Sequence, residues 1–379
     1  MKKPVLALVP SAYKTSIVYS VLPVNGDGDF DFDRASKGTR VREDGLIEEV
    51  TNNVPRLDWY DSNCPSLLLE PQRTNYALNS GDASQWATVS GSQSVTKTQN
   101  YAISPNGTRT AARIQANATG SNYSLIQLST SSFIGNYAGS VYLKSNTGNT
   151  ENVIVYGRNT SVTSYPIGNE WQRIEIQGSG TSGQNLYLFL GSFPNNGSDE
   201  NVDILVWGGQ LEQGTYTSSY IPTPSITTRL KDECLNGGDS DLFNITEGSF
   251  FVDVLPYNAG LVSTISLSNN STSQRILIQF QSNGTQVRLF SSGSVDNYQT
   301  ITFNQRNKIL VTFKLNEYKF YINGALVSTD TSATVPTGLD RVNFSNSTAN
   351  SDFFQGEVND TRVYDRVLTE AEAIKLTTI

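Results

Sequence analysis

Alternation of apolar and polar residues runs through most of the chain and predicts β-strands rather than helices. Between residues 76 and 222, β-branched or aromatic residues occupy every second position of short runs, and clusters of Gly, Asn and Ser separate these runs. The same pattern returns between residues 246 and 379, where Asn323-Gly324 is a strong signal for a hairpin turn. We therefore expect two jelly-roll or β-sandwich domains.

One segment departs from this pattern. In LTEAEAIKL, residues 368–376, Thr369 can cap a helix, Glu370 and Glu372 fall in its first turn and Lys375 lies near its end. The sequence thus predicts an all-β protein that carries one short C-terminal helix.

The first segment, residues 1–75, is the most charged and contains short strand-like runs bounded by prolines, such as TSIVYSVLP and SLLLEP. Strands this short are unable to close a core alone, so we expect the segment to pack on a neighbour or on another copy of the chain. Pro222 and Pro224 begin a stiff, extended stretch, and residues 223–245 are interpreted as a linker.

The stretch NGDGDFDFDR, residues 25–34, could be a calcium loop, a group of catalytic acids or a strand. A calcium loop of the EF-hand type fails, because Phe32 stands where glycine is needed and Gly38 stands where the bidentate glutamate belongs. As a strand, alternation directs Phe30 and Phe32 to a packed face. The opposite face then carries Asp29, Asp31 and Asp33.

Charge and hydropathy argue against nucleic acid and membranes as partners. The formal net charge is −8 and the sequence pI is about 4.8, which disfavours nucleic acid as a partner. No apolar run approaches the ~20 residues that cross a bilayer, and the first apolar stretch is short for a signal peptide. We expect no membrane insertion and folding in a cytoplasm. In a reducing compartment, Cys64 and Cys234 are expected to be two buried free thiols.

The chain has no histidine, which removes the histidine-dependent nucleophilic mechanisms and histidine-ligated zinc. Carboxylate chemistry, mainly glycoside hydrolysis, stays open to an enzyme. The compact acid triplet of glycoside hydrolases on a related sandwich is missing, and Glu357, Asp360 and Asp365 are expected to be solvent-facing charge. We expect a protein that is not an enzyme.

Five ordered phrases in the first segment, from DFDFD to LLLEPQRTN, resemble the N-terminal region of many tailed-phage virion proteins. The phrases between them are GTRV at 38–41, GLIE at 45–48 and NVPRLD at 53–58. The resemblance implies that residues 1–75 are a virion-anchoring region. The candidates for anchoring are Asp29, Asp31, Asp33, Arg40, Arg56 and Asp58.

The other segments resemble known sandwiches. WQRIEI at 171–176 and VWGGQLEQGTYTSSYIPT at 206–223 are similar to carbohydrate-binding-module-like jelly rolls of phage tail and fibre proteins. YINGALVS at 321–328 and TRVYDRVLTEAEAIKL at 361–376 are similar to laminin-G or concanavalin-like sandwiches. These resemblances imply a domain at 76–222 and another at 246–379, both of a type that binds glycan.

Aromatic residues beside turns are the candidates for a glycan site, because a flat ring can cover the apolar face of a sugar. Trp171 and Trp207 lie inside strand-like runs and are expected in the core. The glycan-binding candidates are Trp86, Tyr123, Tyr156, Tyr165 and Tyr298. A structural calcium could use Asp199, Asp203 and Glu212. No other cofactor is expected.

Together these features predict a phage virion structural protein, a fibre, appendage or decoration, that attaches to the particle through residues 1–75 and binds host-surface glycan through its sandwiches. Weak binding by single sites favours a homo-oligomer, with a trimer expected. The protein would be assembled in the host cytoplasm and reside in the virion beside other virion proteins. The alternatives are a purely structural head or tail decoration and a glycan depolymerase.

Overall fold

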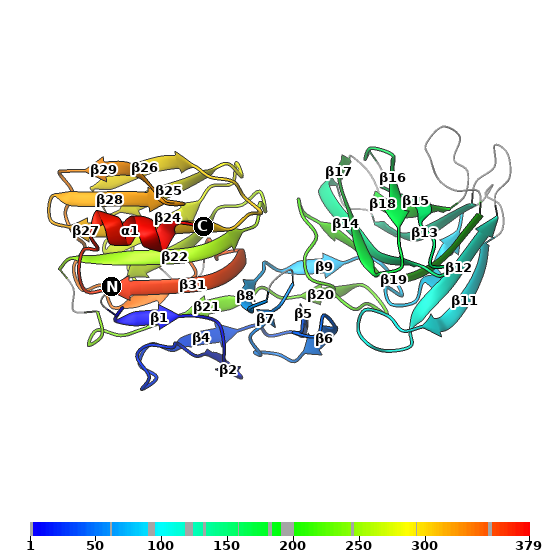
Figure 1. Ribbon diagram of the computed structural model, residues 1–379, viewed down its shortest axis with the longest axis horizontal. Helices are drawn as coiled ribbons and strands as arrows, with labels where there is room; N and C mark the ends of the chain where they lie inside the picture. The colour runs from blue at the N-terminus through cyan, green and yellow to red at the C-terminus, as the bar shows by residue number, and fades with distance from the viewer. Residues whose placement is uncertain are drawn as a thin grey trace.

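The computed structural model describes residues 3–60, 63–89, 95–117, 124–131, 134–157, 159–180, 184–190, 201–243, 246–292, 294–347 and 351–379. Figure 1 shows two β-sandwich lobes side by side, with the N-terminal strands running beneath them. The prediction of an all-β fold with one short C-terminal helix is confirmed. None of the helices in these ranges is long and apolar enough to span a bilayer.

The first lobe is a sandwich of two five-stranded antiparallel sheets, β10-β13-β18-β15-β16 and β11-β12-β19-β14-β17. Alternate residues of its strands point inward, so that Ile114, Val141 and Val155 are buried in one shared core. Its elements are η1 (Ala83–Gln85), β10 (Ala87–Thr88), β11 (Val95–Ala102), β12 (Ala111–Asn117), β13 (Ser124–Ser131), β14 (Gly135–Ser145), β15 (Glu151–Gly157), β16 (Thr163–Ile167), β17 (Gln172–Gly180), β18 (Gln184–Leu190) and β19 (Asn201–Gln213).

The second lobe packs a five-stranded sheet, β26-β25-β24-β23-β30, against a larger sheet with the order β29-β28-β27-β22-β31-β8-β7. Its core is rich in Phe, Ile and Val from both sheets. The strands from this part of the chain are β22 (Gly248–Pro256), β23 (Ser263–Ser268), β24 (Arg275–Phe280), β25 (Gln286–Ser291), β26 (Val295–Thr300), β27 (Asn307–Lys314), β28 (Glu317–Ile322), β29 (Ala325–Asp330), β30 (Arg341–Asn343) and β31 (Gly356–Tyr364).

Helix α1 (Glu370–Thr377) covers one end of the outer face of the larger sheet. It begins at the predicted cap Thr369, and Thr369 and Glu372 form a capping box in which each side chain accepts from the other residue's backbone N–H. Ala373 packs there against Phe251 and Tyr321. The other end of this outer face carries no helix, and it becomes the floor of the site described below.

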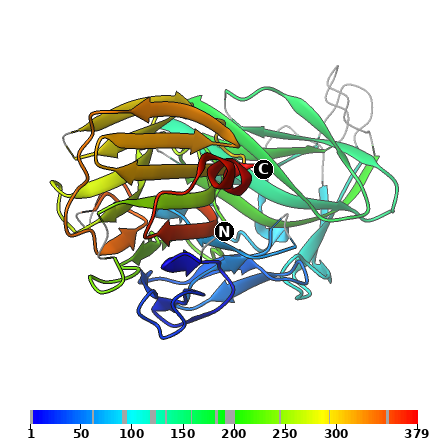
Figure 2. The same ribbon diagram turned by 60° about the vertical axis from the view of Figure 1, so that its left-hand side comes forward.

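The first 75 residues complete the larger sheet of the second lobe. β1 (Leu6–Leu8) and β8 (Ser66–Leu69) both pair with β31, and β7 (Leu57–Asp58) pairs with β8. Leu67 and Leu69 are buried in the core of the second lobe. In Figure 2 the N-terminal strands again lie below that lobe. The prediction that this segment packs on a neighbour is confirmed, and the neighbour is in the same chain.

Strand β4 (Phe30–Asp33) has the alternation that its sequence predicts. Phe30 and Phe32 are buried in the core of the second lobe, whereas Asp31 and Asp33 are exposed. Asp29 is half-buried and accepts a hydrogen bond of 2.9 Å from the backbone N–H of Ser20. The short strands around β4 are β2 (Tyr13–Lys14), β3 (Ile17–Val18), β5 (Gly38–Val41), β6 (Ile47–Val50) and β9 (Arg73–Asn75).

Residues 223–245, interpreted from the sequence as a linker, contain two strands. β20 (Thr227–Arg229) pairs with β9, and β21 (Glu233–Leu235) pairs with β4. The stretch between the lobes is therefore held along the N-terminal segment rather than left free.

The two cysteines are both free thiols. Cys234 in β21 is buried, as expected. The prediction that Cys64 is buried is wrong: it lies in the connection between β7 and β8 and is exposed.

Candidate functional site

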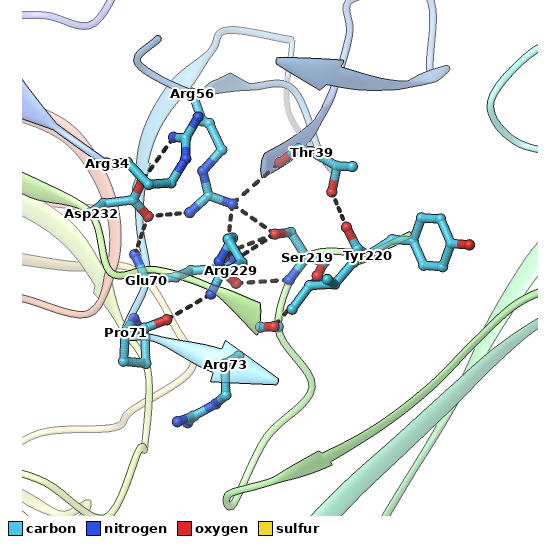
Figure 3. Close-up of polar contacts among 12 residues, drawn as sticks. Arg34, Thr39, Arg56, Glu70, Pro71, Arg73, Ser219, Tyr220, Arg229 and Asp232 are labelled. Carbon is cyan, nitrogen blue, oxygen red and sulfur yellow. Dashed lines mark hydrogen bonds and ion pairs between the residues drawn. The ribbon is translucent and has the colours of Figure 1, made fainter. Parts of the chain in front are cut away.

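Five buried charged residues form a network at the junction of the two lobes, which we call the junction network: Arg34, Arg56, Glu70, Arg229 and Asp232. Arg34 lies 3.0 Å from Asp232, and Arg56 contacts Asp232 as well as Glu70, the latter at 2.6 Å. Arg229 also contacts Glu70. Every one of these side chains is 2% exposed or less, and Figure 3 shows them converging.

The junction network also binds the segment that leaves the first lobe. Ser219 donates its backbone N–H and its hydroxyl to Glu70, at 2.8 and 2.7 Å. Thr39 donates its hydroxyl to the carbonyl of Tyr220, whose ring points away into the first lobe (Figure 3). Four of the phrases that carry the phage resemblance, GTRV, NVPRLD, LLLEPQRTN and TSSYIPT, thus meet at this junction.

Burial and ion pairing act against each other at Glu70. Burial would raise the pKa of its carboxyl group, but the guanidinium groups of Arg229 and Arg56 and the hydrogen bonds from Ser219 hold this pKa well below its usual range. Glu70 is therefore ionised at neutral pH. Its carboxylate binds Arg56, Arg229 and Ser219, and so holds the segment that leaves the first lobe against the junction network.

Beside this network lies a cleft of about 580 Å³ between the lobes. Tyr142 of β14 and Arg173 of β17 line it from the first lobe, and Leu255 of β22 and Glu357 of β31 line it from the second. The N-terminal segment adds Asp58, and the segment after β19 adds Tyr216. All three parts of the chain therefore build one concave surface.

Strand register explains the floor of the cleft. Asp58 lies opposite Ser66, and Leu68, two residues further along β8, lies opposite Glu357. Because residues two apart share a face, these side chains all stand on the outer face of the larger sheet. Leu255, the neighbour of Glu357 on β22, stands on the same face. This is the end of the sheet that α1 leaves uncovered.

Asp58 and Glu357 are the two carboxylates of this floor, and among the described residues only neutral groups donate hydrogen bonds to them. Asp58 accepts from the backbone N–H groups of Val41 and Tyr60, both at 2.9 Å. Glu357 accepts from the hydroxyls of Ser66 and Tyr257, both at 3.0 Å. Burial raises the pKa of both carboxyl groups, and these hydrogen bonds only partly oppose that rise.

Two of the tyrosines that line the cleft pack against each other. The rings of Tyr216 and Tyr257 lie with their centroids 5.0 Å apart, and the guanidinium group of Arg73 lies 5.0 Å from the ring of Tyr216. Tyr216 is 7% exposed, yet its hydroxyl has no hydrogen-bond partner among the described residues. A buried hydroxyl without a partner is costly unless a ligand or water completes it.

The structure does not bring the predicted glycan-binding residues together. Trp86 is 4% exposed and packs in the core of the first lobe, where its indole donates to the carbonyl of Asn79. Tyr156 and Tyr165 are half-buried on β15 and β16. Tyr298, on β26 of the second lobe, is 46% exposed beside Arg288. Tyr123 lies outside the described residues.

The two tryptophans expected in the core differ. Trp207 is buried and packs on Tyr220. Trp171 is half-buried at the edge of the same cluster, and its indole donates to the carbonyl of Ile103.

The anchoring candidates divide between surface and interior. Asp31 and Asp33 are exposed and Asp29 is half-buried. Arg40 is half-buried and pairs with Glu48. Arg56 and Asp58 are buried, the first in the junction network and the second in the cleft. These two side chains contact their own chain, and their anchoring role stays a prediction.

The two calcium candidates that the structure describes, Asp203 and Glu212, do not form a site together. Asp203 and Glu212 lie nine residues apart on β19, which at ~3.3 Å per residue separates them by about 30 Å. Asp203 pairs with Arg113, and Glu212 is buried with Ser218 and Gln210. Asp199 lies outside the described residues. In the part of the chain that the structure describes, no group of three or more acids and cysteines could hold a metal ion.

Sequence reasoning missed the cleft. Glu357 was expected to face solvent, but it is half-buried and accepts hydrogen bonds from Ser66 and Tyr257. Tyr216 lies in the phrase at 206–223 that carries the jelly-roll resemblance, and Tyr257 directly follows β22, but neither position has a local signal for a ligand site. Only strand pairing between distant segments puts these residues side by side.

Comparison with known proteins supports the assignment of the second lobe. Residues 250–373 match the family described as the concanavalin A-like lectin/glucanases superfamily. This range supplies Leu255, Tyr257 and Glu357 to the cleft. A search of curated proteins found no match.

Two solved structures illustrate the similarity to known folds. The CBM40 of Ruminococcus gnavus IT-sialidase, bound to alpha2,3 sialyllactose, is 17% identical with a TM-score of 0.32, over 38% of this chain and 94% of that one. Domain 4 of an extracellular arabinanase from Geobacillus stearothermophilus, in complex with arabinotriose, is 19% identical with a TM-score of 0.33, over 41% and 77%. At these scores the likeness assigns neither a ligand nor a reaction to the chain.

Proposed function

We propose that the protein binds glycan and that the cleft between the lobes is its binding site. The observation that carries the proposal is the composition of the cleft: two carboxylates that accept hydrogen bonds, Asp58 and Glu357, beside the ring pair of Tyr216 and Tyr257. Sugars present hydroxyls to donate and apolar C–H faces to cover. The match of residues 250–373 to a superfamily of lectins and glucanases supports the same class of ligand.

The size of the cleft suits a short glycan segment. Small-molecule sites commonly enclose about 300–1,000 Å³, and the cleft offers about 580 Å³. Its walls come from three parts of the chain that the junction network holds together. A preformed site of this kind binds without first ordering its own side chains.

Matched aromatic variants test where the glycan binds. We expect Tyr257→Ala to weaken binding on a glycan array and in saturation-transfer NMR by about tenfold or more, since it removes one ring and a hydrogen-bond donor to Glu357. Tyr216→Phe keeps its ring and removes only the hydroxyl, so it should cause a smaller loss. The control is Tyr298→Ala, because Tyr298 is exposed on β26 of the second lobe and lies outside the cleft.

The outcomes separate the candidate surfaces. A loss in Tyr298→Ala with none in Tyr257→Ala would move the site to the face of β26. Absence of binding to every glycan on the array would overturn the proposal itself.

Glycan cleavage is the second candidate, because two carboxylates stand in one groove. A hydrolase pair divides its roles: one carboxyl stays protonated and the other stays ionised at the working pH. At Asp58 and Glu357, burial raises both pKa values in the same direction, and no described cation pairs with one carboxylate and not the other to set their roles apart. This favours binding over cleavage. If the wild-type chain released reducing ends from a bound polysaccharide and Glu357→Gln did not, cleavage would be favoured over binding alone.

We further propose that the protein belongs to a tailed-phage particle, as a fibre, appendage or decoration, and binds host-surface glycan from there. The ordered phrases of residues 38–75 support this proposal. Several copies, three in our proposal, would raise the avidity of weak single sites. Imaging of purified particles with an antibody against the exposed Asp31–Asp33 face tests the location. A face that stays accessible on the particle would argue against anchoring through it.

A purely structural decoration is the alternative within the same particle. It predicts that the cleft variants leave particle assembly and host attachment unchanged. The glycan-binding proposal predicts that Tyr257→Ala particles assemble normally and lose attachment. Counting infected cells per assembled particle separates the two.

A further inference from the structure

The positive charges that line the cleft are already engaged. Arg40 lies 2.9 Å from Glu48, and Arg173 lies 3.3 Å from Glu175 while it also donates to Ser140 and to the carbonyl of Ser218. Arg306 forms a bidentate ion pair with the carboxylate of Asp253, in which Nε lies 2.6 Å from Oδ1. Each guanidinium group therefore meets its counter-charge within the chain.

The negative charges of the floor are not engaged in the same way. Within the described residues, neither Asp58 nor Glu357 lies within 4 Å of a lysine or arginine nitrogen, and both accept only from neutral N–H and O–H groups. Glu70, which also lines the cleft, is compensated by Arg56 and Arg229. Among the described residues that line the cleft, the two floor carboxylates thus have no ion-pair partner, whereas Arg40, Arg173 and Arg306 each have a counter-charge.

The hydroxyl of Tyr216 adds a neutral polar group. It is buried, lacks a partner among the described residues, and belongs to a side chain that lines the cleft. A sugar hydroxyl can accept from such a phenol while donating to a carboxylate. A carboxylate or sulfate on the sugar would instead face Asp58 and Glu357 across a poorly solvated space, where like charges repel strongly.

We infer that the cleft selects uncharged glycans, such as neutral hexose, pentose or N-acetylhexosamine polymers, and excludes those that carry carboxylate or sulfate groups. This inference rests on the proposed glycan-binding function and names its ligand class. The selectivity resides in Asp58 and Glu357, which accept hydrogen bonds from hydroxyls and repel anions.

Affinity electrophoresis of the full chain tests the inference with matched polymers. The neutral probes are dextran, galactomannan and arabinan. The acidic probes are the carboxymethylated and the sulfated form of each of these three polymers. We expect retardation by at least one neutral polymer and binding to its acidic counterpart that is weaker by about tenfold or more.

Charge-removing variants locate the cause. Glu357→Gln, alone and with Asp58→Asn, should raise binding to the acidic counterpart of a bound neutral polymer by about tenfold. Glu357→Gln alone keeps the test decisive if the double variant does not fold. The control, Asp296→Asn, changes the net charge equally but neutralises a carboxylate outside the cleft, which pairs with Arg288 on the second lobe. It should leave binding to every polymer unchanged.

The failures are distinguishable. Binding of acidic polymers by the wild-type chain as strongly as neutral ones, or an equal gain in Asp296→Asn, overturns the selectivity and leaves glycan binding standing. No retardation by any polymer overturns both the selectivity and the proposed function.

Discussion

The carboxylate of Glu70 lies 2.6 Å from the guanidinium group of Arg56, and both side chains are withdrawn from solvent. The two residues come from different phrases of the first segment, NVPRLD and LLLEPQRTN. Arg229, from the stretch between the lobes, completes the same carboxylate. The phrases that suggest an external anchor therefore also build the internal joint of the molecule.

Loss of Glu70 should weaken the whole junction. Glu70→Gln leaves Arg56 and Arg229 buried without their shared counter-charge, and breaking a buried pair in this way costs about 3–5 kcal/mol. We expect a drop of this size in the free energy of unfolding, measured by urea denaturation. The control is Glu48→Gln, which removes a partly exposed partner of Arg40 and should cost at most about 1 kcal/mol. Equal losses in the two variants would contradict the role of the junction network.

Glu357 should make stability depend on pH in the opposite sense to a paired acid. Burial raises the pKa of its carboxyl group in the folded chain. Its contribution is therefore fully present below the pKa of an unfolded glutamate, about 4.3, and is lost as pH rises through the higher folded value. The glutamine in Glu357→Gln does not titrate. The free energy of unfolding of this variant should therefore rise relative to that of the wild type as pH increases from 4.5 to 8.

Urea denaturation across that buffer series measures the difference. Glu43→Gln, at an exposed position, is the control and should follow the wild type at every pH. A Glu357→Gln curve parallel to the wild type would show that Glu357 titrates as it does in the unfolded chain.

The two cysteines should react at different rates. Cys64 is exposed, whereas Cys234 is buried and burial raises the pKa of its thiol well above the usual value. A maleimide reagent should modify one thiol of the native chain and two in denaturant, with Cys64→Ser abolishing the native reaction. Rapid modification of Cys234 in the native chain would mean that the β4–β21 pairing opens readily.

The first segment should be indispensable to the second lobe. Without residues 1–75, β31 loses both strands on one edge, and the core loses Phe30, Phe32, Leu67 and Leu69. We expect the fragment 76–379 to aggregate or to unfold at far lower urea than the full chain. Removal of residues 1–3 alone, ahead of β1, is the control and should be tolerated. A stable, cooperatively folded fragment 246–379 would instead indicate a self-sufficient second lobe.

Local pattern predicted the strands and their faces well. The alternation in FDFD placed Phe30 and Phe32 inside, and Thr369 marked the start of the helix, because both signals depend on neighbours along the chain. The pairing of Leu6 with Val363 had no such signal. A period of two says which side chains share a face and leaves open which strand lies alongside.

The residues of the cleft could not be predicted from local sequence patterns for the same reason. Trp86 has polar neighbours in sequence, but it packs against Gly209, where an added Cβ would stand 2.7 Å from the indole. Its burial depends on that distant glycine. Asp58, Tyr216 and Glu357 come from three segments, and only the folded sheet joins them into one cleft.

The position of β31 constrains the order in which the chain can fold during synthesis. Its partners on one edge, β1 and β8, leave the ribosome before the strands of the first lobe, while β31 leaves after them. The larger sheet can therefore close only after the whole first lobe and most of the second have been made, and contacts this distant in sequence form slowly. Until then, the apolar side chains of Phe30 and Leu67 stay exposed, because the core that buries them has not formed. Nascent chains are therefore sensitive to aggregation and to early termination.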